Sequence, residues 1–256
     1  MNHVKAIGFD LFNTLIFARP NTLAEAMDRL TQNLHQNDLR VDGDAFRQAH
    51  REAAMRLIET ARKNGRETHN RFWISAALES LGWTIPPEDA RIAEAVEAYF
   101  SSFYENCRLI PDTPQMLARL GKGYRIGLLS NFTHAPAALK IIDGLGIRAF
   151  FDVVLISGDL GFRKPHLSVF QTLIERLGVD KDQLLYVGDD VEPDIRGAKQ
   201  AGIQPVWTTY VQDNHIPPTP GVLSRSTDEP DFQVPRISSW DDLLALLNHR
   251  DVIPVH

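Results

Sequence analysis

Four short apolar runs of the 256-residue sequence are each followed, directly or in the next loop, by side chains that can take part in a reaction. These side chains are Asp10, Ser130, Asn131, Lys164, Asp189 and Asp194. A carboxylate can attack phosphorus once the negative charge on the phosphoryl oxygens is neutralised, and a lysine together with a divalent cation can neutralise it. The residue types are therefore those that attack on a phosphoryl group requires.

The apolar runs alternate with helical patterns along most of the chain. Residues 4–9, 125–130, 153–157 and 184–188 are short and apolar, which predicts buried strands, and residues 167–177 have the spacing of an amphipathic helix. Repeated strand–helix units form a parallel sheet covered by helices on both faces, so the predicted fold class is α/β. Ligands bind beyond the carboxyl ends of the strands in such sheets. We therefore expect the reactive side chains to meet at one edge.

The C-terminal part of the chain continues this alternation. Residues 195–201 have a helical pattern that ends at Gly202, and residues 212–230 are rich in Pro, Ser, Thr and Asp, which predicts a long loop. We expect a further strand over 234–237 and a terminal helix that begins at Ser238 or Ser239.

The segment between the first two predicted strands is helical throughout. Apolar residues recur at helical spacing in four stretches, the last of which we expect to begin at Pro86, and no strand-like run interrupts them. The first strand needs partners in the sheet. We therefore predict that residues 1–17 and 108–256 form one α/β core and that residues 18–107 form an inserted, all-helical cap.

Composition and charge exclude several classes of partner. The chain has 27 Lys and Arg against 33 Asp and Glu, a net charge of -6, so no global basic field attracts nucleic acid or an anionic membrane surface. No apolar stretch approaches the roughly 20 residues of a membrane-spanning helix. The single cysteine, Cys107, cannot form an intrachain disulfide, and we expect a cytoplasmic protein.

The order of these residues along the chain resembles the haloacid dehalogenase superfamily of hydrolases. Members of that family present a nucleophilic Asp after the first strand, a Ser or Thr after the second, a Lys in a later loop and acidic residues after the fourth. The resemblance covers the whole chain, because the family's smaller helical cap, the C1 type, is inserted where residues 18–107 stand. It implies a Rossmann-like core, a hydrolase, Mg²⁺ as cofactor and a small phosphorylated substrate.

The resemblance also implies a role for each site residue. Asp10 is expected to be the nucleophile that carries the phosphoryl group, and Lys164 to neutralise charge beside it. Ser130 and the backbone amide of Asn131 are expected to bind the phosphoryl oxygens. The expected metal ligands are Asp10, the backbone carbonyl of Phe12, Asp189 and Asp194.

Phe12 departs from the pattern of the family's phosphatases. They carry a second Asp two positions after the nucleophile, which protonates the leaving oxygen and later deprotonates the attacking water. Phe12 cannot exchange a proton, and such general acid–base catalysis is worth about 10²–10⁴ in rate. We therefore expect esters with poor leaving groups to react slowly, whereas acyl phosphates need little protonation.

Three other functions stay open. The first is a metal-free 2-haloacid dehalogenase, because that branch carries Tyr at the position of Phe12, although it has Gly in place of Asn13 and Asp189 adds negative charge that a metal-free site tolerates poorly. The second is a phosphonatase, which needs a cap lysine, and only Lys63 is available, in a charged run typical of a solvated helix end. The third is a non-catalytic homologue that binds metal or phosphate without turnover. Substrate identity and oligomeric state stay open too.

Overall fold

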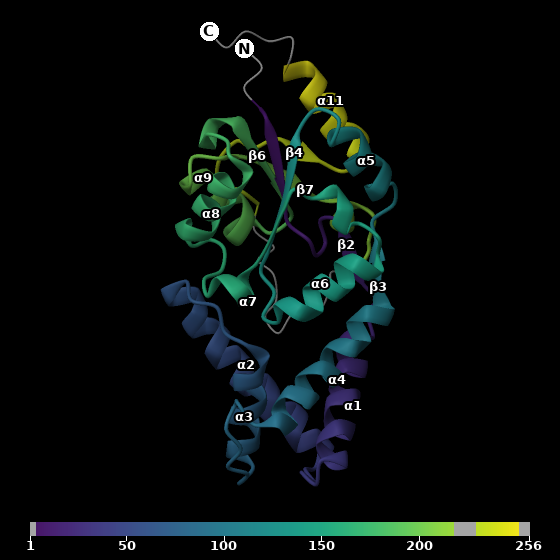
Figure 1. Cartoon of the computed structure of the whole chain (residues 1–256), viewed down its shortest axis with the longest axis vertical. Coiled ribbons are helices and arrows are strands. Elements are labelled where there is room, and N and C mark those ends of the chain that lie inside the picture. Colours follow the sequence, from purple (N-terminus) through teal and green to yellow (C-terminus); the bar gives the residue numbers. More distant parts are fainter. Residues whose placement is uncertain (1–3, 218–228, 251–256) are drawn as a thin grey trace.

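The computed structural model describes residues 4–217 and 229–250 and contains a six-stranded sheet (Figure 1). Its strands are β1 Ala6–Phe9, β4 Arg125–Ser130, β5 Val153–Ile156, β6 Leu184–Gly188, β7 Gln204–Thr208 and β8 Arg236–Ile237. They lie in the order β5-β4-β1-β6-β7-β8, and every neighbouring pair is parallel. The predicted α/β fold is confirmed. The sequence prediction misses β7, because Pro205 and a polar residue at each end conceal its apolar centre.

Successive side chains of a strand point to opposite faces of the sheet, so these apolar strands give the sheet two apolar faces. Helices cover both of them. Ile7 and Phe9 of β1 pack into one hydrophobic core, and Ala6 packs into a second one on the other face. Helices α5 Thr113–Leu120, α6 Ala135–Gly144 and α11 Trp240–Arg250 contribute to the first core, and α8 Leu167–Leu177 and α9 Gly197–Gln200 contribute to the second.

Four helices project beyond the carboxyl ends of the strands (Figure 1). They are α1 Thr22–Gln36, α2 Gly43–Asn64, α3 Asn70–Ser80 and α4 Ala90–Asn106. The side chain of Asp42 caps the N-terminus of α2, and that of Asp89 caps α4. The expected start of the last helix at Pro86 is therefore wrong, because the Asp89 cap places it at Ala90.

A short two-stranded ribbon connects these four helices to the sheet. β2 Ile16–Ala18 leads out of the sheet region and β3 Cys107–Leu109 leads back, and the two strands pair antiparallel. Ala18 lies opposite Cys107 in the register, so the chain leaves and returns at the same point. This pairing supports our proposal that the cap comprises residues 18–107.

Several connections differ in detail from the sequence prediction. Of the helix expected over 195–201, residues 197–200 form α9, and the residues before it belong to a π-helical turn, η3 Val191–Arg196, which runs directly into α9. Of the strand expected over 234–237, only β8 forms. The loop expected over 212–230 includes the end of α10 Tyr210–Asp213, and its residues 218–228 lie outside the described part of the chain.

The remaining short helices are α7 Ser157–Leu160, η1 Arg148–Phe150 and η2 Lys181–Gln183. The terminal helix begins close to its predicted start, because Asp242 accepts hydrogen bonds from the backbone amides of Ser238 and Ser239.

Candidate active site

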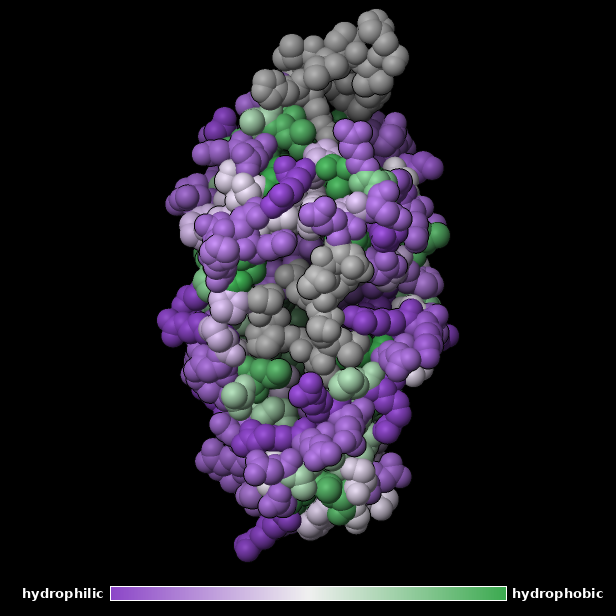
Figure 2. Space-filling view, turned by 180° about the vertical axis from the view of Figure 1, so that it is seen from behind, coloured by the Kyte–Doolittle hydropathy of each residue, from purple (hydrophilic) through white to green (hydrophobic). Residues whose placement is uncertain are grey.

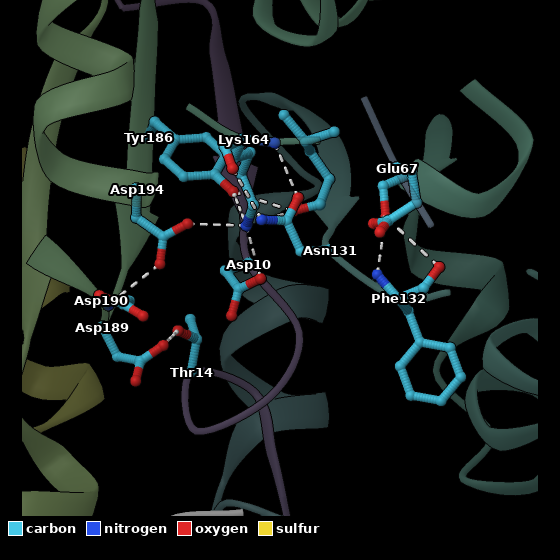
Figure 3. A network of polar contacts seen from close by, with 12 residues as sticks. Asp10, Thr14, Glu67, Asn131, Phe132, Lys164, Tyr186, Asp189, Asp190 and Asp194 are labelled. Atoms are coloured by element: carbon cyan, nitrogen blue, oxygen red, sulfur yellow. Dashed lines mark hydrogen bonds and ion pairs between the residues drawn. The ribbon is translucent and has the colours of Figure 1, made fainter. Parts of the chain in front are cut away.

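The carboxyl ends of β1, β4 and β6 bring most of the predicted site residues to one edge of the sheet (Figure 3). Asp10 follows β1, Ser130 ends β4, and Asp189 follows β6. Lys164 reaches the same place from the loop after α7, and Asp194 from the π-helical turn. Parallel strands place their carboxyl ends together, and this geometry explains why residues from distant parts of the sequence meet.

Lys164 lies at the centre of this group and is 2% exposed. Its ammonium group donates hydrogen bonds to Asp10 Oδ1 and Asp194 Oδ1, each at 2.7 Å. The Leu129 carbonyl and the Tyr186 hydroxyl also lie 2.9 Å from Nζ. Burial acts to lower the pKa of Lys164, but the carboxylates of Asp10 and Asp194 outweigh it and raise the pKa well above its usual value. The lysine therefore stays charged.

Tyr186 is a site residue that the sequence prediction misses. Its side chain is fully buried in β6, and its hydroxyl lies 2.9 Å from both Lys164 Nζ and the Leu129 carbonyl oxygen. The neighbouring β1 makes room for this ring with Gly8, because a Cβ there would lie 2.8 Å from Tyr186 Cδ2. Burial raises the pKa of Tyr186 well above its usual value, so the hydroxyl keeps its proton. The feature of the sequence that could have indicated Tyr186 is a hydroxyl-bearing side chain within an otherwise apolar strand.

The Asn131 side chain holds the backbone of Lys164. Its Oδ1 accepts a hydrogen bond from the Lys164 amide at 2.8 Å, and its Nδ2 donates to the Lys164 carbonyl at 3.0 Å. The peptide bond that follows, between Lys164 and Pro165, is cis. Asn131 thus positions the lysine, a role that the sequence does not reveal. The phosphoryl contacts expected of Ser130 and the Asn131 amide stay predictions.

Three carboxylates form a group that can hold a cation. Asp10, Asp189 and Asp194 each offer one oxygen, and these oxygens lie within 4.8 Å of one another. Hard oxygen ligands of this kind suit Mg²⁺, which takes one or two carboxylates and keeps several waters. The donor set therefore fits the expected metal.

Both oxygens of Asp194 accept hydrogen bonds from the protein. Oδ1 faces Lys164, and Oδ2 accepts from the Asp190 amide at 3.1 Å. Gly188 permits this position, because a Cβ there would lie 2.5 Å from Asp194 side-chain atoms. Burial raises the pKa of Asp194, and Lys164 opposes that rise. Asp194 is better suited to orient the lysine and the metal than to serve as a principal ligand.

The tight turn after Asp10 is set by Asn13 and Thr14. Asn13 has a φ of 59°, in the left-handed region where Gly and Asn are favoured, and its amide donates to the Ile16 carbonyl at 2.6 Å. The choice between Asn and Gly here is thus a matter of backbone conformation and does not discriminate between phosphatase and dehalogenase chemistry. Thr14 Oγ1 donates to Asp189 Oδ1 at 3.3 Å and links the turn to the acids after β6.

Phe12 belongs to an aromatic cluster between the sheet and the helical cap. Its ring stacks on Phe132, with centroids 5.4 Å apart, and meets Phe103 of α4 edge to face at 6.4 Å. Phe100 of α4 also packs on Phe132. The side chain two positions after Asp10 therefore forms an apolar contact with the cap.

Glu67 joins the cap to the loop that carries Lys164. Its side chain accepts hydrogen bonds from Ser157 Oγ and from Arg163 Nη1, the residue before the lysine. The Ser157 hydroxyl in turn accepts from the Phe132 amide at 2.8 Å. Lys63, the cap lysine considered for phosphonatase chemistry, is instead exposed and pairs with Glu59. The described structure thus gives a phosphonatase no support.

The molecular surface carries mostly hydrophilic residues on the face that Figure 2 shows, with apolar residues in small separate areas. Within residues 4–217 and 229–250, no helix is both long enough and apolar enough to cross a membrane.

Known proteins resemble this chain over most of its length. A model of the haloacid dehalogenase-like hydrolase family matches residues 4–202. The glyceraldehyde 3-phosphate phosphatase of Pyrococcus abyssi is 32% identical over 209 residues, which cover 81% of this chain and 82% of that protein. The human N-acylneuraminate-9-phosphatase is 28% identical, and the match covers 98% of this chain and 96% of that one. A solved 2-haloacid dehalogenase from Pseudomonas syringae has a TM-score of 0.72 at 22% identity and covers 97% of this chain and 100% of its own, which supports the fold.

Proposed function

Because the chain belongs to the haloacid dehalogenase-like hydrolase family, we propose that it hydrolyses small phosphorylated molecules through a phosphoryl group carried on Asp10. One observation carries this proposal: Asp10 Oδ1 lies 2.7 Å from the buried ammonium of Lys164, in a group of three carboxylates that can share a divalent cation. Two relatives named as phosphatases of small phosphorylated molecules, matched over more than four-fifths of this chain, support it.

The chemistry proposed for this chain's residues has two steps. An Asp10 oxygen attacks phosphorus, the bond between phosphorus and the leaving oxygen breaks, and the leaving group departs with the electron pair. Water then attacks the phosphorus of the aspartyl phosphate, and the bond between phosphorus and the Asp10 oxygen breaks. Inorganic phosphate departs, and the Asp10 carboxylate is regenerated. Lys164 reduces the repulsion between the carboxylate and the phosphoryl oxygens in both steps, and Ser130 and the Asn131 amide hold those oxygens.

Mg²⁺ is the cofactor we propose. Asp10, Asp189 and the backbone carbonyl of Phe12 would hold it, with Asp194 completing or orienting the set. When bound, the ion supplies positive charge that neutralises the phosphoryl oxygens. The group carries the charges of Asp10, Asp189 and Asp194 against the single charge of Lys164, and this imbalance favours a divalent cation.

Phe12 restricts the substrates that this site can process well. The stacked Phe12 and Phe132 rings provide no proton donor for a departing alkoxide. The leaving groups of acyl phosphates and of esters of acidic alcohols depart without protonation, so we propose that these compounds are the preferred substrates. Hydrolysis of a 2-haloacid is the competing function, and the aromatic residue at position 12 is the observation that favours it. The acidic cluster around Asp189 opposes it, because a haloacid brings a further carboxylate.

The test is turnover of acetyl phosphate, ethyl phosphate and a 2-chlorocarboxylate, each with Mg²⁺ and with excess chelator. We expect acetyl phosphate to be hydrolysed only with Mg²⁺, and ethyl phosphate, whose alkoxide leaving group needs a proton, to react at least about 10²-fold more slowly. Release of chloride in chelator, without phosphatase activity, would establish the metal-free dehalogenase instead. No turnover of any compound by folded protein would indicate the non-catalytic homologue.

A further inference from the structure

The segment that connects α2 and α3 pairs with the loop that carries Lys164. Arg66 and Phe162 form an antiparallel bridge, and a backbone hydrogen bond flanks it on each side. These two hydrogen bonds join residues 65–67 to residues 161–163 and measure 2.9 and 3.0 Å. A segment of the helical cap therefore lies directly against the backbone that precedes the buried lysine.

Gly65 permits this close pairing. It ends α2 with a φ of 71°, in the left-handed region that favours glycine. A Cβ at this position would lie 2.5 Å from Cδ2 of His166, so a side chain would displace the cap segment from the loop. The turn at the end of α2 thus determines where Glu67, two residues later, meets the core.

The carboxylate of Glu67 is buried, and each of its oxygens has a partner in the core. The side chain is 4% exposed. Oε2 accepts a hydrogen bond from Ser157 Oγ, and Oε1 lies 3.2 Å from Arg163 Nη1. A buried carboxylate is costly unless it is paired and hydrogen-bonded, so both partners are needed to keep it in this position.

Ser157 connects this carboxylate to the loop after β4. Its hydroxyl proton goes to Glu67, because a carboxylate only accepts, and its oxygen accepts from the Phe132 amide at 2.8 Å. That amide belongs to the peptide bond between Asn131 and Phe132. Glu67 therefore restrains the backbone that directly follows Ser130 and Asn131, the predicted phosphate-binding residues.

Arg163 connects the same carboxylate to the lysine loop. It directly precedes Lys164, and its side chain is 18% exposed, so solvent screens its ion pair with Glu67 only partly. The Asn131 side chain also joins the two loops, through its hydrogen bonds to the Lys164 backbone. The loop after β4 and the lysine loop are thus joined by one core side chain, Asn131, and by one cap side chain, Glu67.

We propose that Glu67 is a positioning residue for the reaction at Asp10. Its carboxylate sets the position of the phosphate-binding loop through Ser157 and that of the lysine loop through Arg163. The proposal rests on the proposed function, because it assigns what places two groups that act on the phosphoryl oxygens. A displacement of about 1 Å in such groups can cost about 10²-fold in rate, so a side chain that never touches the substrate can still control turnover.

Glu67→Gln tests these contacts with little change in shape. Gln keeps one accepting oxygen but presents an amide donor in place of the other, so it cannot accept from both core partners. Glu97→Gln is the matched control, because Glu97 is a glutamate of α4 that also accepts a hydrogen bond from the core, from His134 Nε2 at 2.7 Å. Among the described residues, Glu97 has no polar contact with Ser157 or Arg163.

We expect Glu67→Gln to lower kcat for acetyl phosphate about tenfold while KM changes by less than about threefold, because the positions of the two loops matter most in the transition state. Ser157→Ala should lower kcat to a similar extent. The double variant should be about as slow as Glu67→Gln alone, since the two residues act in one chain of hydrogen bonds. Glu97→Gln should retain the kcat of the wild type.

Amide hydrogen exchange of the full-length protein measures the same contacts without turnover. In Glu67→Gln, the peptides that contain the Phe132 and Arg163 amides should exchange about tenfold faster than in the wild type, because the restraint on both loops is lost. In Glu97→Gln, the same peptides should exchange at the wild-type rate.

Failure of this proposal is distinguishable from failure of the proposed function. If the wild type hydrolyses acetyl phosphate but Glu67→Gln and Glu97→Gln have equal kcat, Glu67 does not position the site. A lower Tm of Glu67→Gln with unchanged kcat would leave it a structural role alone, and additive losses in the double variant would overturn the route through Ser157. Should Glu67→Gln fail to fold, a wild-type kcat in folded Ser157→Ala would equally overturn the proposal. If no phosphate compound is hydrolysed, the proposed function fails, and unchanged amide exchange in Glu67→Gln then rejects the restraint on the loops as well.

Discussion

The ring of Phe12 lies parallel to the ring of Phe132, with centroids 5.4 Å apart and planes inclined by 5°. Phe12 is two residues from the proposed nucleophile Asp10, and Phe132 is two residues from the predicted phosphate-binding residue Ser130. The stack therefore joins two site loops and presents an apolar surface to the cap. Both the rate and the stability of the protein should depend on it.

Replacing Phe12 with Asp should restore a proton-transfer group at this position. We expect hydrolysis of ethyl phosphate to rise by up to about 10²-fold, while hydrolysis of acetyl phosphate gains much less, because only the poor leaving group needs a proton. Loss of the stacked ring should lower the free energy of unfolding by about 2–3 kcal/mol. Phe12→Asn is the matched control, because it loses the same ring without gaining an acid. Equal rates for the Asp and Asn variants on ethyl phosphate would show that no proton transfer is missing.

Asp10→Asn should abolish turnover while the protein stays folded, because an amide of nearly the same shape is a poor nucleophile. We expect kcat for acetyl phosphate to fall by at least about 10³-fold. Wild-type protein mixed with acetyl phosphate and quenched in acid should gain the mass of one phosphoryl group, since Phe12 provides no base to speed its hydrolysis. The Asn variant should gain none. A variant that retains most of its rate would mean that Asp10 is not the nucleophile.

Tyr186→Phe should slow the reaction through Lys164. The hydroxyl lies within hydrogen-bond distance of the lysine ammonium and the Leu129 carbonyl, so its removal leaves the charged group less firmly held. A hydrogen bond to a charged group is worth about 1.5–3 kcal/mol. Because the Leu129 carbonyl still accepts a hydrogen bond from the ammonium group, we expect kcat to fall only about tenfold. Tyr104→Phe, which removes a hydroxyl that faces Glu97, is the control. A lower Tm with unchanged kcat would show that Tyr186 is merely structural.

Two buried histidines should destabilise the protein as the pH is lowered from neutral, whereas Asp194, whose pKa burial raises, acts in the opposite direction. Burial lowers the pKa of His50 to about 4, and burial together with the nearby His134 and Arg71 lowers the pKa of His69 to about 4. Between about pH 6.5 and 4 the unfolded chain binds protons at these positions that the folded chain does not, so acid favours unfolding. His50→Leu should therefore make the Tm at about pH 5 higher, relative to the Tm at about pH 7, than it is in the wild type. The same difference in the variant as in the wild type would contradict the burial of a neutral His50.

The sequence by itself determines the fold and the membership of the acidic site. The apolar runs that become β1, β4, β5 and β6 are short and flanked by helical periods, and a parallel sheet places the ends of such strands together whatever their distance in the chain. The positions of Asp10, Lys164 and Asp194 after these runs therefore predict that the three residues form one group, as the structure shows.

Only the tertiary structure decides what surrounds that group. Local patterns cannot show that Tyr186 lies beneath Lys164, because its position depends on the space that Gly8 leaves on the neighbouring strand. Nor do they show that the Asn131 side chain holds the lysine backbone, or that Phe12 stacks on Phe132. These contacts join residues far apart in sequence, and side-chain packing across different elements, which has no periodic signature in the chain, determines them.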